Sequence, residues 1–303
     1  MRLVRIGTRG STLALAQSNW VREQLLIRHR DLEVELRVIK TSGDHFLDTL
    51  IPDIGGKGVF TKEIEEALLS KEIDFAVHSM KDLATELPKG LIVAAIPARE
   101  DARDVLVTRT ARSLGELSSG ARVGTGSLRR RAQLLHHRPD LSLAPIRGNI
   151  DTRLRKLDGG EVDALVMAAA GLKRIGREDR IGEYLSDDIC VSAVAQGALA
   201  VEARDENSPR AMLAFLHDAD ASTEVSAERA LLARLGGGCH VPIGARARIA
   251  GDQLKMIAVV ANPDGSGLCR GEIAGMARDG GQLGRRLAEQ LLRQGADKFL
   301  SSA

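Results

Sequence analysis

The feature that most constrains the fold is a short apolar strand that runs directly into a polar turn and then into a helix. This pattern occurs three times in the middle of the chain, with the turns at residues 124–127, 147–149 and 168–171. Strands that alternate with helices predict an α/β fold. In such sheets ligands bind beyond the carboxyl ends of the strands, so these turns are the first candidates for a site.

Arginines are concentrated around the same turns. Residues 121–155 contain eight arginines and no lysine, against only two acids, Asp140 and Asp151. A guanidinium forms paired hydrogen bonds with a carboxylate or phosphate, and free N–H groups at a helix N-terminus attract the same anions. This segment therefore predicts a site for an anionic ligand. The alternative, a set of solvated helix faces, would usually interleave lysines and acids.

Two strands in the N-terminal part of the chain also end in polar residues. A strand over 3–6 leads to a helix over 12–28 with Ser11 as its predicted N-cap, and a strand over 74–77 leads to the polar run 78–82. The other elements predicted in the first two thirds of the chain are strands over 32–38, 91–96, 104–108, 141–146 and 164–167 and helices over 61–69 and 128–137.

A polar, glycine-rich loop covers residues 40–58. Its length and composition predict either a mobile lid near a site or a disordered surface loop.

The C-terminal third has a different pattern. The sequence predicts a helix from the N-cap and N1 pair Ser208-Pro209 to residue 216, and another over 223–235. Antiparallel strands over 245–249, 254–261 and 267–273 and a helix over 282–293 follow. The segments 97–101 and 191–204 are predicted to carry the chain between domains. The predicted domains are residues 1–97 with 195–217, residues 98–194, and residues 218–303.

A lone cysteine, Cys239, lies between Gly236-Gly237-Gly238 and Pro242. Glycines remove side-chain bulk, so a large group has room to reach the thiol, although a small buried residue is the commoner fate of a free cysteine. With three cysteines in all, the chain has neither a CxxC pair nor a Cys/His cluster. We therefore expect reduced thiols, a cytoplasmic location and no metal site.

Composition argues against two classes of function. The net charge is +2 and aromatic residues are few, which disfavours a nucleic-acid-binding protein, although the arginine-rich segment keeps that alternative open. We find no apolar run of about 18 residues and no apolar segment at the N-terminus, so neither membrane insertion nor export is expected.

Six separated segments, in this order, resemble hydroxymethylbilane synthase, also called porphobilinogen deaminase, over nearly the whole chain. They are Arg5-Ile6-Gly7-Thr8-Arg9-Gly10-Ser11, Ala76-Val77-His78-Ser79-Met80-Lys81-Asp82, Gly124-Thr125-Gly126-Ser127-Leu128-Arg129-Arg130, Ile146-Arg147-Gly148-Asn149, Ala170-Gly171-Leu172-Lys173-Arg174 and the Cys239 turn.

The resemblance implies an enzyme that condenses four porphobilinogen molecules into hydroxymethylbilane and releases ammonia. It implies a dipyrromethane cofactor joined by a thioether to Cys239, and Asp82 as the catalytic residue. It also implies two lobes with mixed sheets that resemble periplasmic binding proteins, a C-terminal α+β domain with a three-stranded antiparallel sheet, a monomer, and a mobile loop over 44–57. The positions that match cofactor- and substrate-binding residues are Arg9, Ser11, Lys81, Thr125, Ser127, Arg129, Arg130, Arg147, Gly148, Arg153, Arg174 and Gln196.

The chemistry of these residues agrees with that implication. Each porphobilinogen carries an acetate and a propionate, so a chain of up to six rings presents about a dozen carboxylates to the arginines. Loss of ammonia leaves a cationic azafulvene, which a carboxylate such as Asp82 can stabilise while it manages protons. Without the resemblance, an ion pair with Lys81 or a helix cap would be the simpler role for Asp82.

The chain departs from the family pattern at three positions. Gly236 replaces a usual glutamate, His240 follows Cys239, and Gly126 stands where serine is common. The rival function from another class is a non-catalytic, two-lobed anion-binding protein, which would share the arginines but would need no cysteine turn.

Overall fold

A computed structural model describes residues 2–45, 60–236 and 241–300 of the 303-residue chain. The chain forms two compact units, of which unit 1 is Met1–Arg99 with Ala198–Ala221 and unit 2 is Glu100–Gly197 with Ser222–Ala303. The chain passes from one unit to the other three times. The first two points fall inside the segments 97–101 and 191–204, and the third lies between Ala221 and Ser222, near the predicted boundary at residue 218. The separation of unit 2 into two domains stays a prediction.

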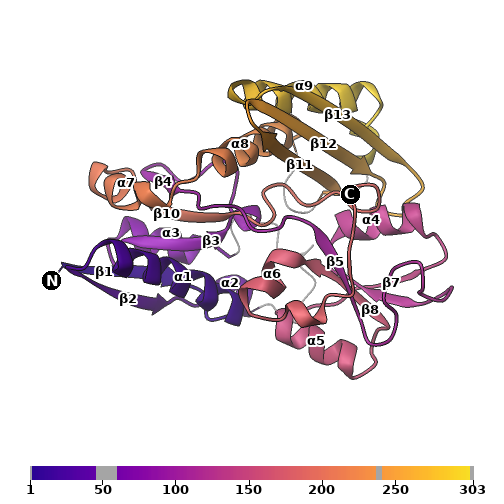
Figure 1. Ribbon diagram of the computed structural model, residues 1–303, viewed down its shortest axis with the longest axis horizontal. Coiled ribbons are helices and arrows are strands. Elements are labelled where there is room, and N and C mark those ends of the chain that lie inside the picture. Colours follow the sequence, from indigo (N-terminus) through magenta and orange to yellow (C-terminus); the bar gives the residue numbers. More distant parts are fainter. Residues whose placement is uncertain (1, 46–59, 237–240, 301–303) are drawn as a thin grey trace. The chain divides into compact units, whose positions relative to one another are not determined.

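Unit 1 is built on a five-stranded sheet with the order β2-β1-β3-β10-β4 (Figure 1). β1 pairs in parallel with β2 and β3, whereas β10 is antiparallel to both β3 and β4. The strands are β1 (Arg2–Thr8), β2 (Leu32–Val38), β3 (Phe75–Ser79), β4 (Leu91–Ala95) and β10 (Leu199–Arg204). The helices are α1 (Thr12–Arg28), α2 (Ser42–His45), α3 (Lys62–Leu69) and α7 (Asn207–Leu213), with short 3-10 turns at Met80–Asp82 and Ala214–Leu216.

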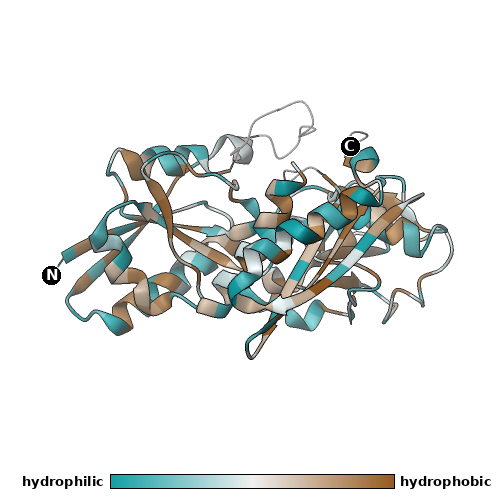
Figure 2. Cartoon of the chain, turned by 90° about the horizontal axis from the view of Figure 1, so that it is seen from above, coloured by the Kyte–Doolittle hydropathy of each residue, from teal (hydrophilic) through white to brown (hydrophobic). Residues whose placement is uncertain are grey.

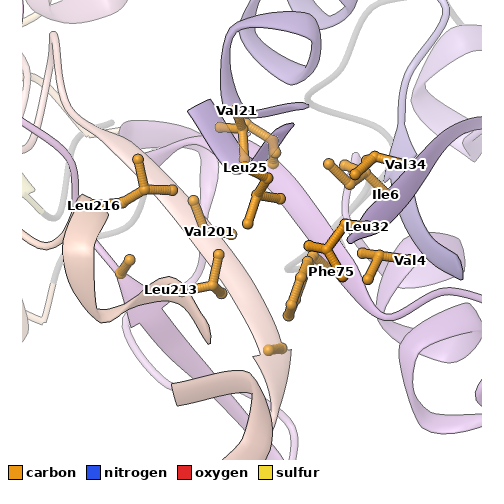
Figure 3. Packing of buried hydrophobic residues seen from close by; sticks show 13 residues of the cluster. Val4, Ile6, Val21, Leu25, Leu32, Val34, Phe75, Val201, Leu213 and Leu216 are labelled. Carbon is orange, nitrogen blue, oxygen red and sulfur yellow. The ribbon is translucent and has the colours of Figure 1, made fainter. Parts of the chain in front are cut away.

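Both faces of the unit 1 sheet are covered. On one face, Val21 and Leu25 of α1 are fully buried in one cluster with residues of β1 and β10 such as Ile6 and Val201 (Figure 3). On the other face, Leu68 of α3 packs in a separate cluster. Burial of apolar helix residues on both sides fixes the sheet in the middle layer, so only its edges and strand ends are left for a ligand.

Unit 2 contains a sheet of the same design, in the order β7-β6-β8-β5-β9. In each sheet the fourth position is taken by the strand that directly follows a passage between units, β10 in unit 1 and β5 in unit 2. The strands are β5 (Asp104–Thr108), β6 (Arg122–Gly124), β7 (Ser142–Ala144), β8 (Ala164–Ala168) and β9 (Glu183–Tyr184). The helices are α4 (Leu128–His137), α5 (Ile150–Asp158) and α6 (Ala169–Arg174), with a 3-10 turn at Glu178–Arg180.

The C-terminal part of unit 2 is a three-stranded antiparallel sheet in the order β11-β12-β13 (Figure 1). Its strands are β11 (Ile243–Ala250), β12 (Gln253–Ala261) and β13 (Leu268–Met276). Its helices are α8 (Ala219–Arg234), α9 (Gly280–Arg293) and α10 (Asp297–Leu300), with a 3-10 turn at Ala277–Asp279. The predicted fold class, two α/β lobes with mixed sheets and a C-terminal antiparallel domain, is confirmed.

Hydropathy follows this layering. Hydrophobic residues lie mainly along the strands, and the helices carry both hydrophobic and hydrophilic residues (Figure 2). No helix in the three described ranges is long and apolar enough to cross a membrane.

Three predicted details are wrong. Ser208 and Pro209 do not start their helix, because α7 begins at Asn207 with Glu206 as N-cap. The next helix begins at Ala219 rather than residue 223, after Asp218 accepts a hydrogen bond from the Ala221 N–H at 2.7 Å. The predicted loop over 40–58 begins with a helical turn, α2, and its residues 46–58 lie outside the described ranges.

Helices α8 and α9 approach too closely at Gly284 for any side chain. A Cβ on Gly284 would lie 2.1 Å from the Ala227 carbonyl oxygen of α8, whereas at Gly281 of α9 the nearest atom is 3.7 Å away, at the tip of Arg285. Because overpacking against backbone costs about 2 kcal/mol, Gly284→Ala should lower the midpoint of thermal unfolding by about 4 °C or more. Gly281→Ala, the matched control, should leave it nearly unchanged. Equal midpoints for the two variants would contradict this packing.

Candidate functional site

The three arginine-bearing turns lie at one edge of the unit 2 sheet. β6 pairs in parallel with both β7 and β8, so the carboxyl ends of these three strands are neighbours. Helices α4, α5 and α6 follow these ends (Figure 1). The predicted convergence of the turns on one edge of a sheet is therefore confirmed.

The first turn is shaped by its own hydroxyl groups. The Thr125 N–H donates to the Ala144 carbonyl at 3.0 Å, and Thr125 Oγ1 accepts from the Ser127 N–H at 3.2 Å. Ser127 is the N-cap of α4, because its Oγ accepts from the Arg130 N–H at 3.4 Å. At Gly126, a Cβ would lie 3.0 Å from the Ile146 carbonyl oxygen, so glycine fits this turn more easily than the family's usual serine.

The second turn depends on a glycine. Gly148 has φ +105°, and a Cβ there would lie 2.6 Å from Thr152 Cγ2. Its carbonyl accepts from Arg153 Nε at 2.8 Å, and Asn149 caps α5 by accepting from the Thr152 N–H at 2.9 Å. These contacts hold the half-buried Arg153 at the start of α5, next to the half-buried Arg147.

Arg129 and Arg130 turn inward to a buried carboxylate, Asp104. Arg129 Nη1 lies 2.6 Å from Asp104 Oδ2, and Arg130 donates from Nε and Nη2 to Asp104 Oδ1 at 2.9 and 2.7 Å. Asp104 is fully buried as the first residue of β5. Because β5 is antiparallel to β8 and Asp104 pairs with Ala168, this residue lies at the same edge as the three turns.

The charges of this cluster are coupled. Burial by itself would raise the pKa of Asp104, but the two guanidinium charges and the hydrogen bonds outweigh it and hold that pKa well below its usual range. Burial and the Asp104 charge raise the pKa of the neighbouring Cys190 to about 12, so this thiol stays protonated. Two cations against one anion leave these four groups with a net charge of +1, which favours an anion at this edge.

Sequence reasoning missed Asp104, although the signal was present. Asp104 is the only charged residue in its strand, where three apolar residues follow it directly. A carboxylate in such a strand is buried only with cationic partners, and two arginines were available at the neighbouring turn.

The second segment that carries the chain between units, residues 191–204, contributes Gln196 to the same cluster. We call this segment the returning passage. The Gln196 side-chain amide donates from Nε2 to Asp104 Oδ1 at 2.9 Å and to the Ala102 carbonyl at 2.7 Å. Arg174, at the end of α6, donates from Nη2 to the Gly197 carbonyl at 2.6 Å, and burial lowers its pKa to about 10. The structure thus brings both predicted residues to the passage.

In unit 1 the predicted residues lie at the carboxyl ends of the neighbouring strands β1 and β3. Ser11 is the N-cap of α1, accepting from the Ala14 N–H at 3.3 Å, and the Arg9 guanidinium lies 4.2 Å from the centre of the Phe60 ring. Lys81 is half-buried and Asp82 is exposed, both in the turn that follows β3. The unit therefore presents a carboxylate and three polar or cationic groups at one edge.

Two predicted features lie outside the described residues: Cys239 with Gly237 and Gly238, and most of the loop over 44–57. Within the described residues, no group of three or more His, Cys, Asp or Glu side chains is arranged to hold a metal ion.

Comparison with protein families gives two matches that together span most of the chain. Residues 4–211 match the family described as porphobilinogen deaminase, dipyromethane cofactor binding domain. Residues 222–293 match porphobilinogen deaminase, C-terminal domain.

Curated relatives agree with these matches. The chain is 50% identical to porphobilinogen deaminase of Syntrophotalea carbinolica over 300 residues. The aligned region covers 99% of this chain and 95% of the relative. It is also 50% identical over 300 residues to porphobilinogen deaminase of Pelobacter propionicus, with 99% and 96% covered. Among solved structures, the methionine-binding protein MetQ is 13% identical, with a TM-score of 0.45 over 75% of this chain and 94% of that one.

We predict that Asp104→Asn destabilises the protein strongly, because it leaves two buried guanidinium groups without their anion. The expected loss is about 3 kcal/mol or more in the free energy of unfolding at pH 7, measured by denaturant titration. The pKa of Asp104 is depressed in the folded state, so its contribution is complete above the unfolded pKa of about 4 and is lost as pH falls below that value. The difference between wild type and variant should therefore shrink below about pH 4.

The matched control is Asp158→Asn, which breaks an exposed ion pair with Arg180 in the same unit. This variant should unfold like the wild type at every pH. A wild-type stability for Asp104→Asn at pH 7 would show that Asp104 does not neutralise the two arginines.

Proposed function

The chain belongs to the porphobilinogen deaminase family, and from this premise we propose how its own residues divide the work of the reaction. The enzyme condenses four porphobilinogen molecules into hydroxymethylbilane, with release of ammonia, in tetrapyrrole biosynthesis, and it uses a dipyrromethane cofactor. When bound, this cofactor supplies the free pyrrole α-carbon to which the first substrate is joined.

The arginine-bearing edge of unit 2 is the observation that supports the proposed binding site. A dipyrromethane built from two porphobilinogen units carries four carboxylates, and this edge offers guanidinium groups and two capped helix N-termini. The donor set therefore fits the cofactor. We assign Arg147 and Arg153 to direct contact with carboxylates, and Thr125, Ser127 and Gly148 to the shape of the turns.

Arg129 and Arg130 are proposed to act on carboxylates in a different way. Their guanidinium groups are paired with Asp104, so they attract carboxylates mainly through the positive charge that remains after this pairing. Gln196 and Arg174 hold the returning passage beside them. In unit 1, Arg9, Ser11 and Lys81 serve the carboxylates of the incoming substrate.

Asp82 is the proposed catalytic residue. It is an exposed carboxylate at the carboxyl end of β3, where α/β sheets place ligands. There it stabilises the positive charge that develops on pyrrole nitrogens and transfers protons at the leaving amine and at the coupling carbon.

Cys239 is the proposed attachment point of the cofactor. The other two cysteines are buried, and burial raises the pKa of both thiols, that of Cys190 to about 12. A thiol that stays protonated is a poor nucleophile, so neither of them competes for a thioether bond. The glycines around Cys239 leave room for the attached group.

The remaining proposals follow the family. We propose a monomer in the cytoplasm that acts on porphobilinogen without nucleic acid or membrane partners. We further propose three domains: residues 1–97 with 195–217, residues 98–194, and residues 218–303.

Intact mass of the purified protein tests the attachment. We expect an added mass equal to two porphobilinogen units less their two ammonia molecules, and we expect it to be absent in Cys239→Ser. Cys269→Ser, the matched control, should keep the addition. An unmodified wild type produced with porphobilinogen available, or a modified Cys239→Ser, would rule out this anchor.

Steady-state kinetics test the role of Asp82. Asp82→Asn should retain the cofactor, by intact mass, yet turn over about 100-fold or more slowly, because the amide neither carries negative charge nor exchanges the proton. Asp31→Asn removes an exposed carboxylate at the opposite edge of the same sheet and should turn over normally. A normal rate in Asp82→Asn would refute the assignment.

A further inference from the structure

Along the outer edge of the C-terminal sheet, backbone N–H groups donate to carboxylates of α8 and to the returning passage. β11 is an edge strand, and the N–H groups of alternate residues are directed away from β12. The Ala245 N–H donates to the Ser192 carbonyl at 2.9 Å, the Ala247 N–H to Glu228 at 2.7 Å and the Ile249 N–H to Glu224 at 2.9 Å. Glu224 and Glu228 lie one turn apart on α8, which runs beside this edge (Figure 1).

Glu228 differs from Glu224 because it holds a second segment. Its Oε1 accepts from the Ala247 N–H, and its Oε2 accepts from the Ala195 N–H at 2.6 Å. The residue is fully buried. A buried carboxylate that accepts two backbone hydrogen bonds joins the C-terminal sheet to the passage at residue 195.

Ala195 needs such support because its backbone is strained. It has φ +59°, the left-handed region that disfavours residues with a Cβ. The strain continues into a close approach at Gly197, where φ is +88° and a Cβ would lie 2.3 Å from the Glu100 carbonyl oxygen. Two hydrogen bonds hold this path: the Gln196 N–H donates to the Ala193 carbonyl within the passage at 2.9 Å, and the Ala195 N–H donates to Glu228 outside it.

The turn at Ala195 determines where the next side chain lies. Gln196 follows directly, is buried, and donates to Asp104 Oδ1 at 2.9 Å, beside the Arg130 guanidinium. A continuous set of contacts thus runs from α8 through Glu228, the Ala195 amide and Gln196 to the Asp104 carboxylate. None of these residues needs to touch the ligand.

We propose that Glu228 is a positioning residue of the enzyme. By holding the left-handed turn at Ala195, it places Gln196 on Asp104 and so fixes the orientation of the Arg129 and Arg130 guanidinium groups. In this way the domain that carries the cofactor-anchoring turn also sets the geometry of the arginine pair. The inference rests on the proposed function at one point, the action of this pair on ligand carboxylates.

The structure supplies a control for the simpler view that Glu228 only braces α8 against β11. Glu224 makes the corresponding contact with the same strand, one turn of α8 away, whereas the Ala195 N–H donates to Glu228. Glu224→Gln therefore removes a brace of the same kind and leaves the Glu228 carboxylate on the Ala195 turn in place.

The test compares Glu228→Gln with Glu224→Gln as holoenzymes whose cofactor content is equal by intact mass. Glutamine keeps the size of the side chain but turns one acceptor into a donor that faces an N–H. We expect Glu228→Gln to lower kcat/KM for porphobilinogen about tenfold, mainly by raising KM. The positive charge of the arginine pair attracts the carboxylates of the substrate as well as those of the cofactor, and it does so alike in ground and transition states. Glu224→Gln should keep the wild-type KM even where its thermal midpoint falls equally.

The decisive measurement is whether Ala195→Gly rescues the Glu228→Gln variant. Glycine adopts the left-handed region without strain, so Ala195→Gly in the Glu228→Gln background should restore most of the lost kcat/KM. Ala195→Gly alone should act like the wild type. A purely structural brace predicts no such recovery, because the contact with β11 stays broken.

The outcomes separate the two proposals. Equal KM in both glutamine variants, or no recovery by Ala195→Gly, overturns the positioning role. Should Glu228→Gln not fold, Glu228→Asp keeps the charge on a shorter arm and is judged by the same rescue. A normal KM in both Arg129→Lys and Arg130→Lys would instead overturn the action of the pair on the ligand, without touching the Glu228 result.

Discussion

The structure of unit 2 depends on the neutralisation of one buried carboxylate. Asp104 begins the strand that enters the unit, and it accepts hydrogen bonds from α4 and from the returning passage. An isolated charge at this depth would be prohibitive, so the strand, the helix and the passage can only adopt their positions together. The same contact leaves a surplus of one positive charge next to the three strand ends. Stability and affinity for anions therefore come from one cluster.

The buried carboxylates of unit 1 have different surroundings from those of unit 2. His78 Nε2 lies 3.0 Å from Glu202 Oε2 between β3 and β10, but neither atom makes a hydrogen bond within the described part of the chain. Burial, together with the charge of Glu202, raises the pKa of the neighbouring Glu65 on α3. In unit 2, by contrast, Asp104 and Glu228 receive well-directed hydrogen bonds. The buried carboxylates of unit 2 thus fix the positions of backbone and arginine donors, whereas the Glu202 carboxylate of unit 1 accepts no hydrogen bond from any residue that the structure describes.

The sequence predicted local structure well wherever periodicity and caps agreed. α1 and α4 have the predicted bounds, and each begins at a serine N-cap whose side chain accepts a backbone hydrogen bond. It failed where tertiary contacts decide: α7 starts before Ser208 and Pro209, and α8 starts four residues early. The strand ends and their arginines were predictable. The inward direction of Arg129 and Arg130 was not, since it depends on Asp104, a residue distant in sequence whose partners only the fold reveals.

In the proposed function, the division of the chain also separates attachment of the cofactor from catalysis. By sequence, Cys239 and the arginine-bearing turns belong to unit 2, and Asp82 belongs to unit 1. With the cofactor attached at Cys239, as proposed, its first carboxylates stay with the cations of unit 2, while each added ring brings two new carboxylates that need cations of their own. The Asp104 cluster meets part of that need, because two arginines on one carboxylate leave one surplus positive charge whose position is fixed by ion pairs within unit 2.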